Sequence, residues 1–434
     1  MSLLNRFWSN SILKNLSFLV SGTALAQVII IVFQIVLRRI FNPSDFGAFA
    51  VYMSIVGIIA TVSSLRYEQA IILPTDETKA YNLLHLSFAI GLVFSFITLI
   101  AIVFFRQPIM VLVNYPEEYA NWLMFIPVSL LFLTIYQAYN YYLIRLKFFW
   151  LSASNKVERR IAEGVTQTIV GKLGHKIGLV MGDVVGQFVN AVAAGIKVHK
   201  NTRELKASVS GMRQVAIDYK AFPLQNSAAA FLNALCLMLP TIFVNRLFDE
   251  QTTGIFDLAR MILIMPLSLV TTSMGQVLVQ NFSEKRNKRE SVKGVYLRII
   301  TLLGIGALAF ATLATIFAPM LIAFIFGEGW RESGLYIQIL AWSFLLKFVV
   351  SPFNMVFTAF EKIGRLSIWQ IIYFVLIISL LLFEFNSVYS FLIALSVVDI
   401  ISYIIVGLMG LRVVNEYESE LKTETKEENQ CQNK

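Results

Sequence analysis

Long apolar runs, separated by short polar loops, follow one another along almost the whole chain. The runs at residues 83–105 and 388–411 are longer than the roughly 20 apolar residues needed to cross about 30 Å of hydrocarbon. The pattern therefore predicts an all-α membrane protein. The apolar segments lie at residues 16–37, 46–65, 83–105, 122–144, 161–170, 177–198, 228–244, 255–279, 295–318, 335–360, 366–385 and 388–411.

The fifth segment, residues 161–170, is too short and polar to be assigned by hydropathy, so the surrounding charges must decide. Membrane proteins keep most Lys and Arg residues in cytoplasmic loops. With a cytoplasmic N-terminus and a spanning fifth segment, the 36 Lys and Arg residues divide into 26 inside, 7 outside and 3 within spans. If the fifth segment did not cross the membrane, the basic loops 197–220 and 285–298 would lie outside the cell. We therefore predict twelve spans, both termini cytoplasmic, and a fifth helix whose polar face is turned from lipid.

An internal repeat supports this count. Residues 39–49 and 246–256 share the pattern R-x-F-x5-G-x-F at an offset of 207 residues, each joining the first and second spans of a six-helix half. Because six is even, both halves enter the membrane in the same orientation and form a parallel repeat. We predict two six-helix lobes around a central cavity.

The predicted organisation has five parts. No removable signal sequence is visible at the start, so we expect the first span to be retained. We expect the polar tail to be cytoplasmic and disordered. The parts are an amphipathic segment 1–15, an N-lobe 16–199, a cytoplasmic inter-lobe loop 200–223, a C-lobe 224–411 and the tail 412–434.

Composition and missing motifs narrow the function. A mean hydropathy of +0.69 with 15% charged residues is typical of a membrane protein, and the net charge of +9 is explained by topology without nucleic acid. The sequence has no ATP-binding phosphate loop, no metal-ligand pattern among 2 Cys and 3 His residues, and no loop of catalytic-domain size. A transporter without a bound cofactor fits better than an enzyme.

Three cations fall at or within predicted spans: Arg66, Arg260 and Lys347. Each would cost about 2.5 to 3.5 kcal/mol if it faced lipid, so we expect them to face the bundle interior or a wet cleft. For Arg66, the alternative is that its long side chain reaches the cytoplasmic headgroups.

Three acids accompany these cations: Glu68, Asp257 and Asp399. Asp257 and Arg260 are spaced i, i+3 on one helical face, so a purely structural ion pair is the alternative to a functional site. The same face continues through Thr271.

Other polar and aromatic positions recur at helical spacing. Gln27 and Gln34 form a polar stripe with Arg38 on the first span. A tyrosine-rich stretch at residues 136–142 fits an interfacial aromatic belt better than a sugar-stacking platform.

The chain also resembles a known family. SLRYEQAIILPTDETKAYNLL, GLVMGDVVGQFVNAV, TTGIFDLARMILIMPLSLVTTSMGQVL and FGEGWRESGLYIQILAWSFLLKFVVSP are similar to Wzx-type oligosaccharide flippases of the polysaccharide biosynthesis family, over residues 17–411. The resemblance implies a MATE-like fold in the bacterial inner membrane. It also implies movement of undecaprenyl-diphosphate-linked oligosaccharide units, with a polysaccharide polymerase and chain-length machinery as candidate partners.

Roles for the polar residues follow from that substrate. The guanidinium fork binds diphosphate better than lysine does, so we assign Arg66 and Arg260 to the diphosphate, then Lys347. We assign the sugar hydroxyls to Gln27, Gln34 and Thr271, and coupling to an H⁺ or Na⁺ gradient to Glu68, Asp257 and Asp399. Two alternatives stay open: a MATE-like exporter of small organic cations, and a polytopic glycosyltransferase or polymerase.

Overall fold

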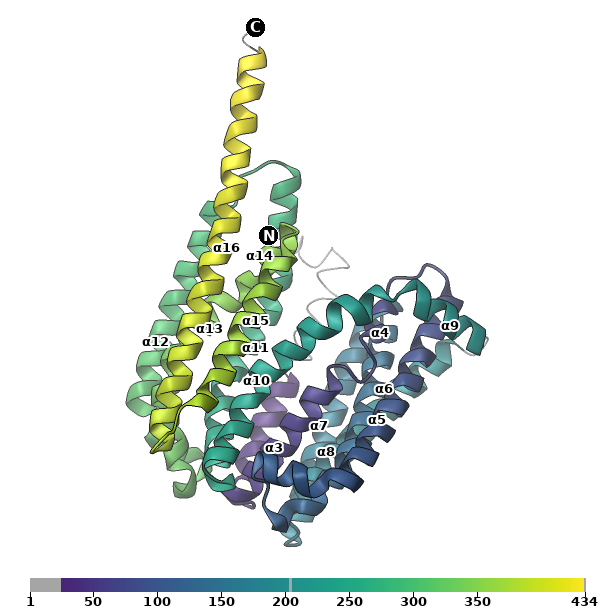
Figure 1. The fold of residues 1–434 in the computed structure, drawn as a ribbon, viewed down its shortest axis with the longest axis vertical. Helices are drawn as coiled ribbons and strands as arrows, with labels where there is room; N and C mark the ends of the chain where they lie inside the picture. The colour runs from purple at the N-terminus through teal and green to yellow at the C-terminus, as the bar shows by residue number, and fades with distance from the viewer. Residues whose placement is uncertain (1–24, 203–204, 433–434) are drawn as a thin grey trace, which may run out of the picture. The chain divides into compact units, whose positions relative to one another are not determined.

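The computed structural model describes residues 25–202 and 205–432, which are almost wholly helical and contain no strand (Figure 1). The chain forms two compact units: unit 1, Met1–Asp257 with Ile325–Gly329, and unit 2, Leu258–Phe324 with Trp330–Lys434. One helix, α11 (Glu250–Asn287), begins in unit 1 and continues into unit 2.

Unit 1 is a helical bundle in which α8 packs against both α6 and α7, and α5 packs against α6. Asn42 caps α3 in a reciprocal capping box with Asp45, and Pro43 at the first turn fits the helix start. The helices are Leu25–Leu37, α3 (Pro43–Ala60), α4 (Tyr67–Ala70), α5 (Glu77–Val113), η1 (Glu117–Phe125), α6 (Ile126–Arg145), α7 (Phe149–Lys172), α8 (Gly178–Asn201), α9 (Val209–Asp218), η2 (Phe222–Asn226), α10 (Ser227–Leu247) and the start of α11.

Unit 2 packs α13 and α15 against the long helix α16, which Figure 1 shows as one continuous ribbon. Gly334 allows this part of the chain to pack closely, because a Cβ there would lie 2.3 Å from the Cα of Pro319. Besides the rest of α11, the helices are most of α12 (Lys293–Phe326), the end of η3 (Glu328–Trp330), α13 (Arg331–Val350), η4 (Ser351–Asn354), α14 (Met355–Ala359), α15 (Ile363–Ser379), η5 (Leu380–Leu382) and α16 (Val388–Gln432).

Within the described residues, 10 helices are long and apolar enough to cross a membrane. The helix Leu25–Leu37, the described part of the first predicted span, is apolar but shorter. The fifth predicted span corresponds to α7, a helix of 24 residues that is not among these ten, so its crossing of the membrane stays a prediction. Its exposed apolar side chains Ile161, Val165 and Ile169 recur every fourth residue. Its polar side chains Asn155, Arg159 and Gln167 are turned toward protein instead, as the sequence predicts for this helix.

The tyrosine-rich stretch forms neither an interfacial belt nor a sugar platform, so that prediction was wrong. Tyr136, Tyr139 and Tyr142 are buried in the hydrophobic core of unit 1, together with Tyr67 and Tyr81 from α4 and α5. Large rings at these positions bury more apolar area than an aliphatic residue would, which explains their use in a core.

The tail was predicted to be disordered, and this was also wrong: α16 continues without interruption to Gln432. Val413 and Val414 are buried, so the apolar face outlasts the predicted span. Glu418 Oε1 accepts hydrogen bonds from the backbone N–H groups of Val292 and Lys293, at 2.8 and 3.0 Å. A carboxylate at the first turn of α12 stabilises that helix end.

The predicted inter-lobe loop contains the helix α9. Ser208 caps it by accepting a hydrogen bond from the N–H of Gly211, and the Tyr67 hydroxyl donates to the carbonyl of Ala216. An ion pair of 3.2 Å joins Asp218 to Lys79 on α5. The two compact units part at Asp257 rather than in this loop, and the predicted lobe boundaries stay predictions.

Candidate functional site

A buried polar network lies inside unit 1, where α7 and α8 pack together. The Asp183 carboxylate on α8 is fully buried and accepts a hydrogen bond of 2.8 Å from Ser129 Oγ on α6. Because Ser129 gives its proton to Asp183, the Tyr52 hydroxyl must be the donor in its 2.7 Å contact with Ser129. Arg159 on α7 lies 3.5 Å from Asp183 and 3.7 Å from Glu163. One guanidinium is therefore shared by two carboxylates.

The network continues along α8 in one direction. Gln187 donates to Asp183 at 3.3 Å, and Asn190 follows at the next turn on the same face. Lys197, further along, binds Glu158 at 3.0 Å and the side-chain oxygen of Asn155. Several amide atoms of this stripe have no hydrogen-bond partner among the described residues, although their side chains are at least 99% buried: Gln187 Oε1, Asn155 Nδ2, and Asn190 Nδ2 and Oδ1. Buried orphan amides are the sites where proteins hold internal water.

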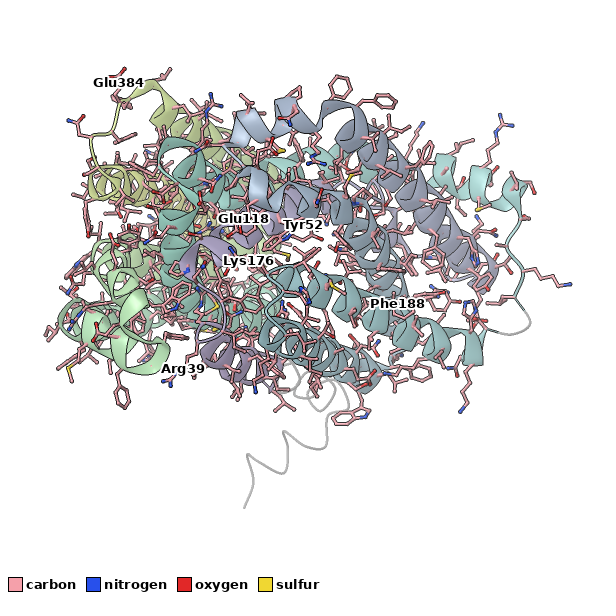
Figure 2. All side chains as sticks on the ribbon, turned by 90° about the horizontal axis from the view of Figure 1, so that it is seen from below. Arg39, Tyr52, Glu118, Lys176, Phe188 and Glu384 are labelled. Atoms are coloured by element: carbon pink, nitrogen blue, oxygen red, sulfur yellow. The ribbon has the colours of Figure 1, made fainter. Side chains whose placement is uncertain are left out.

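Another charged cluster closes the opposite end of α7 and α8. Lys176 lies between Asp45 and Glu118, at 3.7 and 2.5 Å, and its ammonium sits 5.5 Å from the centre of the Tyr119 ring. Figure 2 labels Lys176 and Glu118, which lie next to each other. The Tyr119 hydroxyl donates to Asp45 at 2.9 Å, so this cluster ties η1 to the start of α3.

Arg66 lies in a turn rather than in a spanning helix, because α3 ends at Ala60 and the short α4 begins at Tyr67. Its backbone is left-handed, with φ 64°, and its side chain is 25% exposed. The nearest acid is Glu68, at 3.7 Å, which also accepts a hydrogen bond from Ser64. Burial raises the pKa of the Glu68 carboxyl, against the opposing effects of the Ser64 hydrogen bond and of Arg66.

The polar stripe of the first helix leads to an ion pair. Gln34 accepts a hydrogen bond of 3.2 Å from Arg38 Nε, and Arg38 Nη2 donates to Asp257 at 3.0 Å. The Arg38 side chain is fully buried and stacks over the Phe46 ring at 4.0 Å. Gln27 lies half-buried nearer the start of that helix. The structure thus pairs Asp257 with Arg38, a partner that sequence spacing did not reveal.

In unit 2, Lys347 on α13 pairs with Asp399 on α16 at 2.6 Å, and both are buried. The Tyr373 hydroxyl on α15 donates to the other oxygen of Asp399, also at 2.6 Å. The Lys347 ammonium lies 4.7 Å from the centre of the Phe344 ring and 5.6 Å from that of Tyr403. Two residues predicted to act separately, one on substrate and one on the coupling ion, therefore form one cluster.

The remaining predicted residues lie on the part of α11 that belongs to unit 2. Arg260 and Thr271 are both half-buried. The Thr271 hydroxyl oxygen is buried and has no hydrogen-bond partner among the residues that the structure describes. Its assignment to the sugar hydroxyls stays a prediction.

The sequence matches the family model described as polysaccharide biosynthesis protein over residues 36–335. The chain belongs to the polysaccharide biosynthesis protein family. No curated protein sequence matches it.

Solved structures show the fold of this family member. A multidrug resistance MATE family transporter of the MOP superfamily, in an inward-facing conformation, aligns with a TM-score of 0.72 at 14% identity, covering 91% of this chain and 96% of that chain. The lipid II flippase MurJ aligns with a TM-score of 0.72 at 13% identity, covering 93% and 91%. MATE in complex with MaD3S aligns at 0.61 with 16% identity, covering 94% and 97%. The predicted MATE-like all-α membrane fold is confirmed.

The Asp183 network is the part of this polysaccharide biosynthesis protein that sequence reasoning missed. Asp183 lies in a stretch that carried the family resemblance, yet it received no role. The sequence does contain a pattern that indicates this network: Asp183, Gln187 and Asn190 recur at i, i+4 and i+7, on one face of a largely apolar helix. Arg159 and Glu163 are spaced i, i+4 on the neighbouring helix.

Proposed function

We propose that the protein is a flippase that moves an undecaprenyl-diphosphate-linked oligosaccharide unit across the bacterial inner membrane, by alternating access. The observation that carries the proposal is membership of the polysaccharide biosynthesis protein family, joined to a fold shared with a protein described as a lipid II flippase. The proposed partners are a polysaccharide polymerase and chain-length machinery, which would act on the oligosaccharide unit after it has crossed the membrane.

The physical problem of moving this substrate fits the chain. A diphosphate and a glycan do not cross hydrocarbon unaided, whereas a polyprenyl tail remains in it. A protein that solves this needs charged and polar groups at membrane depth. Arg66, Arg260 and Lys347 are the proposed diphosphate ligands, and Gln27, Gln34 and Thr271 the proposed glycan ligands.

We propose that an H⁺ or Na⁺ gradient drives the cycle. The candidate coupling carboxylates are Glu68, Asp257 and Asp399, each ion-paired in the structure. Asp183 joins them, because it is fully buried and shares its cation with a second acid. Such groups change protonation or partner when the protein changes conformation.

Purified protein in liposomes with lipid-linked glycan tests the proposal. Appearance of the intact glycan lipid in the opposite leaflet, without any bond change, supports a flippase. Two other outcomes would replace the proposal. Chain elongation would identify a polymerase or glycosyltransferase. Gradient-driven efflux of an organic cation without glycan movement would identify an exporter, the activity that the name of the multidrug resistance MATE neighbour describes.

The proposed topology places both termini and the basic loops in the cytoplasm. Single cysteines replacing Lys206 or Lys288 should be protected from a membrane-impermeant maleimide added to intact cells, while one replacing Glu328 should react. The expectation follows from the retention of Lys and Arg on the cytoplasmic side. Labelling at position 206 from outside would contradict the twelve-span arrangement.

Substitution of Arg66 gives the most direct test of the proposed substrate site. If Arg66 binds the diphosphate, Arg66→Ala should abolish glycan export at normal protein abundance, and Arg66→Lys should be only partly active, because lysine keeps the charge without the fork. Surface glycan and membrane protein level are measured together. Arg213→Ala, at an exposed position on α9, is the matched control.

Other roles for Arg66 give different results. If its side chain only reaches headgroups, Lys should replace Arg fully. If it is a structural partner of Glu68, Arg66→Ala should lower abundance, and adding Glu68→Gln should restore it, because an unpaired buried charge is what destabilises. Full export by the alanine variant would remove Arg66 from the substrate site.

A further inference from the structure

The internal repeat reappears in the structure as a close crossing of two equivalent helices. α3 begins at Pro43 and α11 at Glu250, which preserves the sequence offset of 207 residues. A Cβ built on Gly47 would lie 1.7 Å from the carbonyl oxygen of Glu250, and one on Gly254 would lie 1.9 Å from that of Pro43. Each repeat glycine therefore faces the first residue of the other repeat's helix.

These distances leave no room for any side chain. Real Cβ atoms essentially never approach a heavy atom within 3.0 Å, and here the neighbours are backbone carbonyls that cannot rotate away. The glycine in R-x-F-x5-G-x-F is thus required by the crossing itself. The reciprocity of the two contacts is what a pseudo-two-fold axis passing between Gly47 and Gly254 would produce.

The arginine of the same motif acts at the same end of the helices, again reciprocally. Arg39 Nη2 donates to the carbonyl of Ile325 at the end of α12, at 3.3 Å. Arg246 Nη1 donates to the carbonyl of Leu112 at the end of α5, at 3.2 Å. α5 and α12 are the third spans of their halves, so each arginine reaches the equivalent helix of the other half.

All of these residues belong to unit 1, and α11 leaves that unit within one turn of Gly254, after Asp257. The contact between the helix starts is made by backbone and glycine, with hydrogen bonds from exposed arginines. At its closest point the contact holds only glycine and backbone atoms, so no interlocked side chains oppose separation there. It has the properties of a closure that can open.

We propose that the crossing of Gly47 and Gly254 is a reversible seal at the predicted outer ends of α3 and α11, closed in this structure and parted when the protein opens outward. The proposal rests on the proposed alternating access, but its test needs no substrate. Failure to move the glycan would count against the flippase function. The cysteine-labelling experiment described below tests the seal alone.

The reporter is a cysteine in place of Val51, which is fully buried one turn beyond Gly47 on α3. Its labelling from outside by a membrane-impermeant maleimide is measured in intact cells, in the Cys431→Ser background. The chain without Val51→Cys gives the contribution of the buried Cys236. Gly47→Ala should hold the helices apart and raise the labelling rate about ten-fold or more, since overfilling a tight contact strains it.

Gly57→Ala is the matched control on the same helix, because its Cβ would meet only the Met238 side chain at an ordinary 3.5 Å. It should leave the labelling rate unchanged. Arg246→Gln removes one carbonyl bond without adding volume, and should raise labelling about two- to five-fold at normal abundance.

Two results would overturn the seal. In the first, Gly47→Ala accumulates and labels like the parent protein, so the helices tolerate the extra atom without parting. In the second, which decides the matter if Gly47→Ala fails to accumulate, Arg246→Gln reaches normal abundance with no rise in labelling.

Discussion

Replacing Lys347 by methionine is expected to lower the amount of folded protein in the membrane severely. The change leaves the Asp399 carboxylate buried without its cation, while the Tyr373 hydroxyl still donates to it. Removing one partner of a buried ion pair costs about 3 to 5 kcal/mol, a large part of the stability of a typical protein. Membrane abundance and thermal unfolding in detergent measure the effect. Lys362→Met, at an exposed position, is the control and should change little.

The double variant Lys347→Met with Asp399→Asn separates stability from substrate binding. It removes both charges, so abundance should recover to near the parent level. If Lys347 also binds the diphosphate, the recovered protein will still fail to export glycan. Export at the parent rate would show that Lys347 serves only the fold of unit 2. A single Lys347→Met variant with normal abundance would refute the ion pair as a stabilising element.

The helices were predictable because their signal is local. An apolar run long enough to cross a membrane, and the placement of Lys and Arg around it, are both properties of consecutive residues. Even α7 could be recognised as a helix, since the loop charges required it. Its polar face is explained only by the structure, in which Arg159 and Glu163 meet Asp183 on α8.

Partners across helices were not predictable from spacing. The i, i+3 relation indicated that Asp257 and Arg260 share a face, but it gave no sign of Arg38, 219 residues earlier, which binds Asp257 in the structure. Asp399 likewise reaches Lys347 from a different helix. Spacing along one helix shows which residues share a face, but the choice of partner depends on helix packing that a single sequence does not contain.

The tail shows the opposite kind of error. Its polar composition predicted disorder, because few apolar residues were available to offset the entropy of ordering. Two buried valines and the hydrogen bonds to Glu418 hold the first part of the tail against unit 2, and a helix already formed extends without a new nucleation step.

Replacing Asp183 by asparagine is expected to separate a coupling role from a structural one. Asparagine has nearly the same shape and can still accept the Ser129 hydrogen bond, so the helix packing should persist. Arg159 keeps Glu163 as an acidic partner. If Asp183 carries the coupling proton, transport by Asp183→Asn should lose its dependence on the pH gradient while abundance stays near normal.

The Arg159→Met variant measures how much the same network contributes to stability. It leaves both Asp183 and Glu163 without their shared cation, although Arg160 remains bound to Glu163 at 2.8 Å. Abundance should fall sharply, and adding Asp183→Asn should restore most of it, because the uncompensated buried carboxylate is gone. A proton-coupling role for Asp183 requires that the restored double variant also transport without sensitivity to the pH gradient. Gradient-driven transport by Asp183→Asn at the parent rate would instead leave Asp183 as a structural anchor between α6, α7 and α8.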